Sequence, residues 1–343
     1  MPAQPIAVRA TGLVTSVGLS APAACAAIRC KLTNPSETRF IDSAGEWIMG
    51  HSVLLEKPWR GLAKLAKMAA LAIDECLANV EAEDRRNLPL LLCVAERERP
   101  GRLEGLDDQL FLDIAAELDA RFTSASRVIA QGRVSVAVAL GHARRLLHEQ
   151  KVPRVVIAAT DSLLMWPTLS QYERADRLLT ARNSNGFMPG EGAGALLIEV
   201  PSGGSELLCT GLGFGVEKAH IESGEPLRAE GLSAALKAAL VEAAREMHDL
   251  DFRITDVSGE QYYFKEASLA LSRTLRKRKA EFDIWHPAEC TGEAGALAGA
   301  SIIALADAAC RKEFAPGRNI VAHLANDAGQ RAAVALQFQA GAR

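Results

Sequence analysis

Residues 185–199 read NGFMPGEGAGALLIE, the most specific string in the chain. Glycine occupies four of these positions, and a residue without a Cβ reaches positive φ and lets a neighbouring backbone approach closely. Residues 195–200, which follow the last of these glycines, form a mainly apolar run of strand length. The string therefore predicts a glycine-rich structural turn that leads into a buried strand, with Gly190, Glu191, Gly192 and Gly194 in the turn.

Working outward from this string, short apolar runs alternate with amphipathic segments along the chain. Residues 61–80 repeat apolar side chains every three or four positions, which is the spacing of one helix face, whereas residues 88–96 form a short apolar run of strand length. This alternation is typical of α/β proteins with buried sheets. Since 343 residues exceed the usual size of a single core, we predict an α/β fold of two similar halves, residues 1–200 and 201–343.

Three irregular stretches interrupt this alternation, at residues 33–60, 97–107 and 161–192. They are longer than ordinary connections between elements, and long loops in compact domains commonly carry function. We expect them to build a site or an interface.

The charge, hydropathy and cysteine content of the chain indicate which classes of partner and which cellular compartment to expect. A formal net charge of -3 gives no electrostatic attraction to nucleic acid or to a membrane surface, and no apolar run has the length of a membrane span or a signal peptide. The seven cysteines are scattered, without a CxxC pair or a His/Cys cluster at metal spacing. The sequence therefore predicts a cytoplasmic protein without metal or cofactor, which neither binds nucleic acid nor spans a membrane.

Several segments, in chain order, resemble the β-ketoacyl synthases of the thiolase-like superfamily. They are the opening strand and turn (IAVRATGLVTSVGLS), the block LGHARRLL followed by VPRVVIAATDSL, the string at 185–199, and residues 290–316, CTGEAGALAGASIIALADAACRKEFAP. The resemblance covers nearly the whole chain. It implies a five-layer α-β-α-β-α fold of two fused halves and a homodimer.

The resemblance also implies a decarboxylative condensation that depends on four side chains. A cysteine at a helix N-terminus takes the acyl group as a thioester, two histidines stabilise the enolate, and a lysine supports them. At the matching positions this chain has Arg133 for the cysteine, Ser258 and Glu289 for the histidines, and Ile284 for the lysine. Because a guanidinium stays protonated, it is not a nucleophile. We therefore predict that condensation has been lost.

Residues near these positions offer weak replacements. Ser135 follows the arginine without a base beside it in sequence, and His286 lies three residues before the second histidine position, which changes both face and reach. Cys290 is the candidate residual nucleophile, although such a cysteine more commonly packs as a small apolar residue. Residues 324–333, which match the family's gating loop, contain one glycine and no aromatic residue.

The replacements predict a new interaction. In the family the cysteine and the second histidine face each other, so the resemblance places Arg133 opposite Glu289. A helix dipole disfavours a cation at the helix N-terminus, which calls for an anionic partner. We predict a buried or half-buried ion pair between Arg133 and Glu289 with Ser258 hydrogen-bonded beside it. The alternative is that Arg133 points to solvent past a shortened loop.

These features favour a catalytically inactive ketosynthase-like scaffold or adaptor, a homodimer that acts through contacts with another protein. The resemblance makes an acyl carrier protein one candidate partner, and it associates such chains with bacterial acyl-assembly or secretion gene sets. The alternative is an acyltransferase or malonyl-thioester decarboxylase that uses Ser258, Glu289 or Cys290, with Arg133 polarising the thioester. A third hypothesis is binding of lipid or coenzyme A without reaction.

Overall fold

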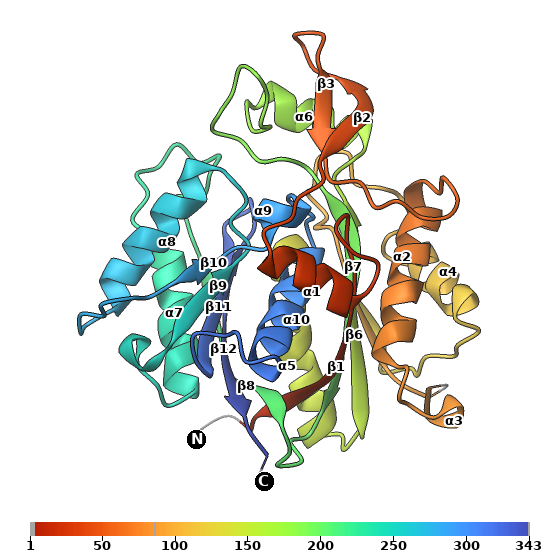
Figure 1. Ribbon diagram of the computed structural model, residues 1–343, viewed down its shortest axis with the longest axis vertical. Coiled ribbons are helices and arrows are strands. Elements are labelled where there is room, and N and C mark those ends of the chain that lie inside the picture. The colour runs from red at the N-terminus through yellow and green to blue at the C-terminus, as the bar shows by residue number, and fades with distance from the viewer. Residues whose placement is uncertain (1–3, 86, 342–343) are drawn as a thin grey trace.

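The protein folds around a ten-stranded mixed β-sheet, which a computed structural model describes for residues 4–85 and 87–341 (Figure 1). The strands follow the order β10-β9-β11-β12-β8-β1-β7-β6-β4-β5. The strands of the first half are β1 (Ile6–Val14), β4 (Leu90–Val94), β5 (Arg127–Ala130), β6 (Arg154–Ser162) and β7 (Glu191–Glu199). Those of the second half are β8 (Glu206–Val216), β9 (Phe252–Thr255), β10 (Ile284–Trp285), β11 (Asn319–Ala325) and β12 (Gln330–Gln339).

The two halves of the sheet repeat one topology. In the first half β5, β4 and β6 are parallel, and β7 and β1 continue the sheet antiparallel. In the second half β10, β9 and β11 are parallel, and β12 and β8 continue it antiparallel. A short antiparallel pairing of β1 with β8 joins the halves. The repeat in element order agrees with the expectation of two similar halves; their assignment to residues 1–200 and 201–343 as separate domains stays a prediction.

Helices complete a layered α/β arrangement, the thiolase-like fold class predicted from the sequence (Figure 1). The helices α1 (Ala21–Arg29), α5 (Ser135–His148) and α10 (Leu297–Arg311) lie between the two parts of the sheet. The outer faces carry α2 (Gly61–Cys76) and α4 (Gln109–Glu117) on one side, and α7 (Glu230–Glu242) and α8 (Gln261–Thr274) on the other. Three separate hydrophobic clusters fill the spaces between these layers.

The small residues of α10 let the central layer pack tightly. Gly299 lies against Val136 of α5, and a Cβ on this glycine would come within 2.6 Å of the valine Cβ. β4 is buried along its whole length, which explains its continuous apolar sequence, because a parallel strand is covered on both faces.

The glycine-rich string differs from its prediction in one respect. β7 already begins at Glu191, so Gly192 and Gly194 belong to the strand, and neither they nor Gly190 has positive φ. A Cβ on Gly192 would lie 2.5 Å from the carbonyl oxygen of Val14, and one on Gly190 would lie 2.3 Å from that of Thr291. Close backbone approach, and not a left-handed turn, is therefore what requires glycine here.

Two of the three irregular stretches, 33–60 and 161–192, contain short elements that gather at one end of the molecule, whereas residues 97–107 contain only turns. A hairpin of β2 (Ser36–Ile41) and β3 (Trp47–Gly50) projects there beside α6 (Trp166–Arg174) (Figure 1). The remaining short helices are α3 (Ala82–Arg85), α9 (Ala288–Thr291), and the 3-10 turns η1 (Gly132–Val134) and η2 (Met247–Asp249). No helix within residues 4–85 and 87–341 is long and apolar enough to cross a membrane.

Candidate functional site

Arg133 lies in the turn η1, directly before α5, and is 6% exposed. This places it at the inner end of the central layer, and not at the surface as in the solvent-facing alternative. The residue before it is Gly132, with φ of 54°, and a Cβ there would come within 2.0 Å of a carboxylate oxygen of Glu96. The sequence therefore needs a glycine for the turn that aims Arg133 inward.

The guanidinium of Arg133 is surrounded by acids and a tyrosine. Nη1 lies 3.2 Å from Oε2 of Glu293, and Nη2 lies 2.7 Å from both Oδ1 of Asp327 and the hydroxyl of Tyr263. Nε is 3.8 Å from Oδ2 of Asp256, and the Tyr263 ring centroid is 4.5 Å from the guanidinium carbon. Both terminal nitrogens of the guanidinium thus donate hydrogen bonds, whereas Nε makes only a longer ionic contact.

A second buried arginine completes this arrangement through a shared acid. Arg177 forms a bidentate pair with Glu260, at 2.8 and 2.9 Å, and contacts Oδ2 of Asp327 at 2.7 Å. The Tyr172 hydroxyl donates to the same carboxylate at 3.2 Å. Asp327 therefore bridges Arg133 and Arg177.

A third arginine, Arg99, packs against Gly132, next to Arg133, and Gly295, near Glu293. Arg99 pairs with Glu96 at 2.7 Å and with Asp161 at 3.3 Å, and atoms of these side chains would contact any Cβ on Gly132 or Gly295. We call the whole set the arginine cluster. Its members are Arg99, Arg133 and Arg177, the acids Glu96, Asp161, Asp256, Glu260, Glu293 and Asp327, and the hydroxyl groups of Tyr172, Ser258 and Tyr263.

The pKa shifts in the cluster follow from burial and charge. Burial opposes ionisation of Asp327, but Arg133 and Arg177 together hold the pKa of this carboxyl well below its usual range. Burial likewise opposes the charge on Arg133, yet Tyr263, Glu293 and Asp327 raise its pKa well above the ordinary value. Asp256 is more weakly paired, and burial raises its pKa to about 6. The arginines therefore stay charged, and none is a proton donor to a substrate.

The predicted ion pair between Arg133 and Glu289 is wrong. Glu289 lies on the outer side of the short helix α9, where it approaches Lys31 at 3.5 Å and His286 at 3.9 Å. The chain reverses at Gly292, with φ of 69°, and this turn brings Glu293 inward instead. The acid that Arg133 requires is present, but it comes four residues later than the resemblance implied.

Ser258 reaches Arg133 through a shared acid, whereas Ile284, like Glu289, does not lie at this site. The Ser258 hydroxyl donates to Oε2 of Glu293 at 2.8 Å, so serine and arginine share one carboxylate. Ile284 lies on the edge strand β10, and together with His286 and Glu289 it lines an outer groove of about 770 Å³. Ile284 and Glu289 therefore belong to a different surface of the molecule.

The candidate nucleophiles are poorly suited to attack. Cys290 is 1% exposed, and burial, with Glu289 nearby, raises the pKa of its thiol to about 11, so the reactive thiolate is scarce at neutral pH. The Ser135 hydroxyl donates to the carbonyl of Ile129 at 3.1 Å within the start of α5. Within the described part of the chain, no group of three or more His, Cys, Asp or Glu side chains is arranged to hold a metal ion.

An open cavity of about 590 Å³ lies on the Glu96 side of the cluster, but little free space remains on the side of Asp256 and Glu293. The cavity lined by Asp256, Thr291, Glu293 and Ser301 measures about 20 Å³, which is room for roughly one water molecule. An acyl chain does not fit there in this conformation.

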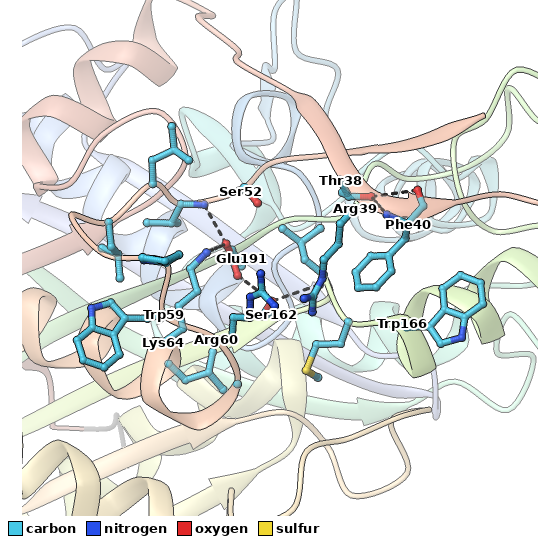
Figure 2. A pocket seen from close by; sticks show the side chains of 18 of the residues that line it. Thr38, Arg39, Phe40, Ser52, Trp59, Arg60, Lys64, Ser162, Trp166 and Glu191 are labelled. Carbon is cyan, nitrogen blue, oxygen red and sulfur yellow. Dashed lines mark hydrogen bonds and ion pairs between the residues drawn. The ribbon is translucent and has the colours of Figure 1, made fainter. Parts of the chain in front are cut away.

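An open cavity of about 720 Å³ lies elsewhere, between the β2–β3 hairpin, the segment before α2, and the start of α6 (Figure 2). We call it the outer cavity. Its floor is Glu191, a member of the glycine-rich string, which pairs with Lys64 of α2 and accepts from the Val53 amide at 3.0 Å and the Ser162 hydroxyl at 2.9 Å. Glu191 thus fastens the irregular segment 52–60 to the sheet.

The acids of the arginine cluster were not identified from the sequence, although their positions at the ends of apolar strands could have indicated them. Glu96 follows β4, Arg133 follows β5, Asp256 follows β9 and Asp327 follows β11, while Asp161 lies near the end of β6. Within each half these strands are parallel, so their carboxyl ends meet at one edge, where α/β proteins commonly place their sites. Charged residues directly after apolar strands would have identified the cluster.

No model of a known protein family and no curated protein matches this chain. Solved structures do match in fold. A chain from the AntDE:AntF structure, described as a type II PKS acyl-carrier protein in complex with its ketosynthase, gives a TM-score of 0.82 at 15% identity, covering 98% of this chain and 100% of that chain.

Two further structures give the same result. One is the ketosynthase ApeO in complex with its chain length factor ApeC from Xenorhabdus doucetiae, with a TM-score of 0.78, 13% identity and 98% coverage of both chains. The other is a β-ketoacyl synthase from Burkholderia phymatum, with a TM-score of 0.75 and 13% identity, covering 98% of this chain and 99% of that chain. The protein therefore has the thiolase-like fold of ketosynthases and chain length factors, as the resemblance implied.

Proposed function

We propose that this protein is a non-catalytic ketosynthase-like scaffold or adaptor. The observation that carries the proposal is Arg133, which takes the position that the resemblance assigns to the nucleophilic cysteine and is held there by Glu293, Asp327 and Tyr263. A charged group in this place neither attacks a thioester nor leaves room for an acyl chain.

The alternative enzymatic function depended on free donors and a nucleophile. Arg133 and Ser258 were the candidate donors to a thioester oxygen, but both already contact Glu293. The thiol of Cys290, with its pKa raised to about 11, is the remaining nucleophile. These contacts favour the scaffold over an acyltransferase or a decarboxylase.

The partner class follows from the same fold comparison. Among the similar structures, one holds an acyl-carrier protein with its ketosynthase and another holds a ketosynthase with its chain length factor. We propose a second ketosynthase-like chain or a carrier protein as partner, and a homodimer as the form without a partner. Light scattering on the purified protein measures the latter directly.

Intact-mass spectrometry tests the absence of catalysis. The protein is incubated with an acyl thioester and malonyl-coenzyme A, with an active ketosynthase as positive control, and adducts and released CO₂ are measured. We expect neither. The variant Cys30→Ala is the matched control, because Cys30 is exposed and open to non-enzymatic acylation, whereas Cys290 is buried. An adduct or CO₂ release that Cys290→Ala abolishes and Cys30→Ala does not would overturn the proposal.

A further inference from the structure

The surface around the outer cavity concentrates exposed aromatic and apolar side chains. Trp59 and Trp166 line the cavity, and Trp47 lies on the adjoining hairpin, so three of the chain's four tryptophans occupy this end of the molecule. Trp166 is 46% exposed, Trp47 47%, and Leu54 at the cavity rim 80%. Exposed apolar side chains that gather in one region of a surface mark interaction sites, in contrast to scattered ones.

Two arginines line the same cavity without an acidic partner. Arg39 of β2 and Arg60, directly before α2, both point into it (Figure 2). Among residues 4–85 and 87–341 neither forms an ion pair or a side-chain hydrogen bond, although the exposed Glu37 and Glu56 also line the cavity. Lys64 is already neutralised by Glu191. The cavity thus offers two guanidinium groups without an acidic partner, although that of Arg39 lies 4.9 Å from the Phe40 ring centroid. Guanidinium is the group best suited to bidentate binding of carboxylates.

We propose that the outer cavity is a docking site for an acidic segment of a partner polypeptide that carries an apolar side chain. Its carboxylates would pair with Arg39 and Arg60, and its apolar side chain would lie against Trp166, at the opposite end of the cavity from Trp59 (Figure 2). This proposal rests on the scaffold function proposed above and specifies the class of partner.

The extent of the surface favours a polypeptide over a small molecule. Beyond the cavity, the hairpin carries further exposed apolar side chains, where Trp47 pairs with Ile41, itself 43% exposed. A small anion would fill only the region between the arginines. Tryptophan and arginine are also the residues that contribute most to binding at protein interfaces.

Phage-displayed random peptides provide the probe. The library is panned on the intact protein, and enriched peptides are labelled with fluorescein and titrated by anisotropy. We expect enriched peptides to combine acidic and apolar residues and to bind less tightly at higher salt. Arg39→Glu with Arg60→Glu, and separately Trp166→Ala, should each weaken binding about 10-fold or more.

Arg273→Glu with Arg276→Glu is the matched control, since both residues are exposed and the change in net charge is the same. Binding there should stay within about 2-fold of the original protein, as expected for residues outside an interface. The proposal is overturned if no peptide is enriched, or if enriched peptides bind the Arg39/Arg60 variant as well as the original protein.

It is also overturned if light scattering shows that the cavity variants dissociate a dimer, because a second copy would then cover this face. The intact-mass acylation assay described above tests the proposed scaffold function independently of peptide binding. Covalent acylation would overturn the scaffold while leaving peptide binding measurable, and a failure of peptide binding would leave the acylation result unchanged.

Discussion

The arginine cluster and the outer cavity use the same side chain in opposite ways. In the cluster, Arg133 and Arg177 are buried, and acids and tyrosine hydroxyls engage them from several directions. In the outer cavity, Arg39 and Arg60 are exposed and have no ion pair among the described residues. Removing an acid from a buried arginine leaves a charge without a partner inside the protein, whereas an arginine without an acidic partner at a cavity is available for binding. The comparison predicts stability effects in one region and binding effects in the other.

The largest effect is expected at the acid shared by two arginines. Asp327→Ala leaves Arg133 and Arg177 without their bridging carboxylate, so the free energy of unfolding should fall by about 3–5 kcal/mol. Urea unfolding followed by circular dichroism measures the loss. Asp107→Ala is the control, since among the described residues the exposed Asp107 pairs only with Arg102, and its removal should cost at most about 1 kcal/mol. Equal losses in the two variants would contradict the special role of the cluster.

His323 offers a contrast to the paired, buried arginines of the cluster, because among the described residues it is buried without a hydrogen-bond partner. Neither ring nitrogen has a hydrogen-bond partner among the described residues, and burial, with Arg253 and Arg331 nearby, lowers the pKa to about 3. Below its unfolded pKa of about 6.5, the unfolded state binds a proton that the folded state does not. Above a pH of about 6.5 His323 is neutral in both states, and the stability that depends on its neutral form is fully present. As the pH falls from there toward 3, proton binding by the unfolded state lowers the free energy of unfolding.

The His323→Leu variant removes that proton linkage. Between about pH 4 and pH 6 its free energy of unfolding should fall less steeply with decreasing pH than that of the original protein, by about 1.4 kcal/mol per pH unit. Urea titrations at several pH values give both slopes. Parallel slopes would show that His323 titrates alike in the folded and unfolded states.

Removing a single hydroxyl from the cluster should have an intermediate effect. The Tyr263 hydroxyl donates to Asp327 at 2.6 Å and accepts from Arg133 at 2.7 Å. Tyr263→Phe keeps the ring beneath the guanidinium but leaves two buried polar groups short of a partner, at a cost of about 1–2 kcal/mol. Thermal unfolding measures the shift, with Tyr262→Phe, whose hydroxyl contacts Ala219 and Arg331, as a comparison outside the Arg133 site. An unchanged midpoint would mean that the Tyr263 hydrogen bonds contribute little.

The smallest stability effect belongs to the outer cavity. Arg39→Ala with Arg60→Ala removes two exposed and unpaired cations, so the free energy of unfolding should change by less than about 0.5 kcal/mol. The same urea experiment measures it. A loss comparable to that of Asp327→Ala would show that these arginines hold the fold together and would weaken their assignment to binding.

Much of the fold could be predicted because it depends on local patterns. The apolar run of β4 and the helix-spaced apolar residues of α2 mark their elements within a few residues. The start of β7 was placed too late, because glycines that serve close packing resemble glycines that serve a turn. That an arginine occupies the position which the resemblance assigns to a cysteine was likewise visible from the sequence, since it concerns which residue is present.

The partners of that arginine were decided only by the tertiary structure. A sequence offset of four residues separates Glu289 from Glu293, and the left-handed turn at Gly292 decides which of them faces inward. Asp327 and Arg177 come from distant segments that meet only when α6, α8 and the end of β11 pack together. The sequence by itself determined the layered fold and the cation at its centre, because apolar periodicity and residue identity are local. Which acids neutralise that cation, and which arginines stay free, depended on long-range packing that no local pattern specifies.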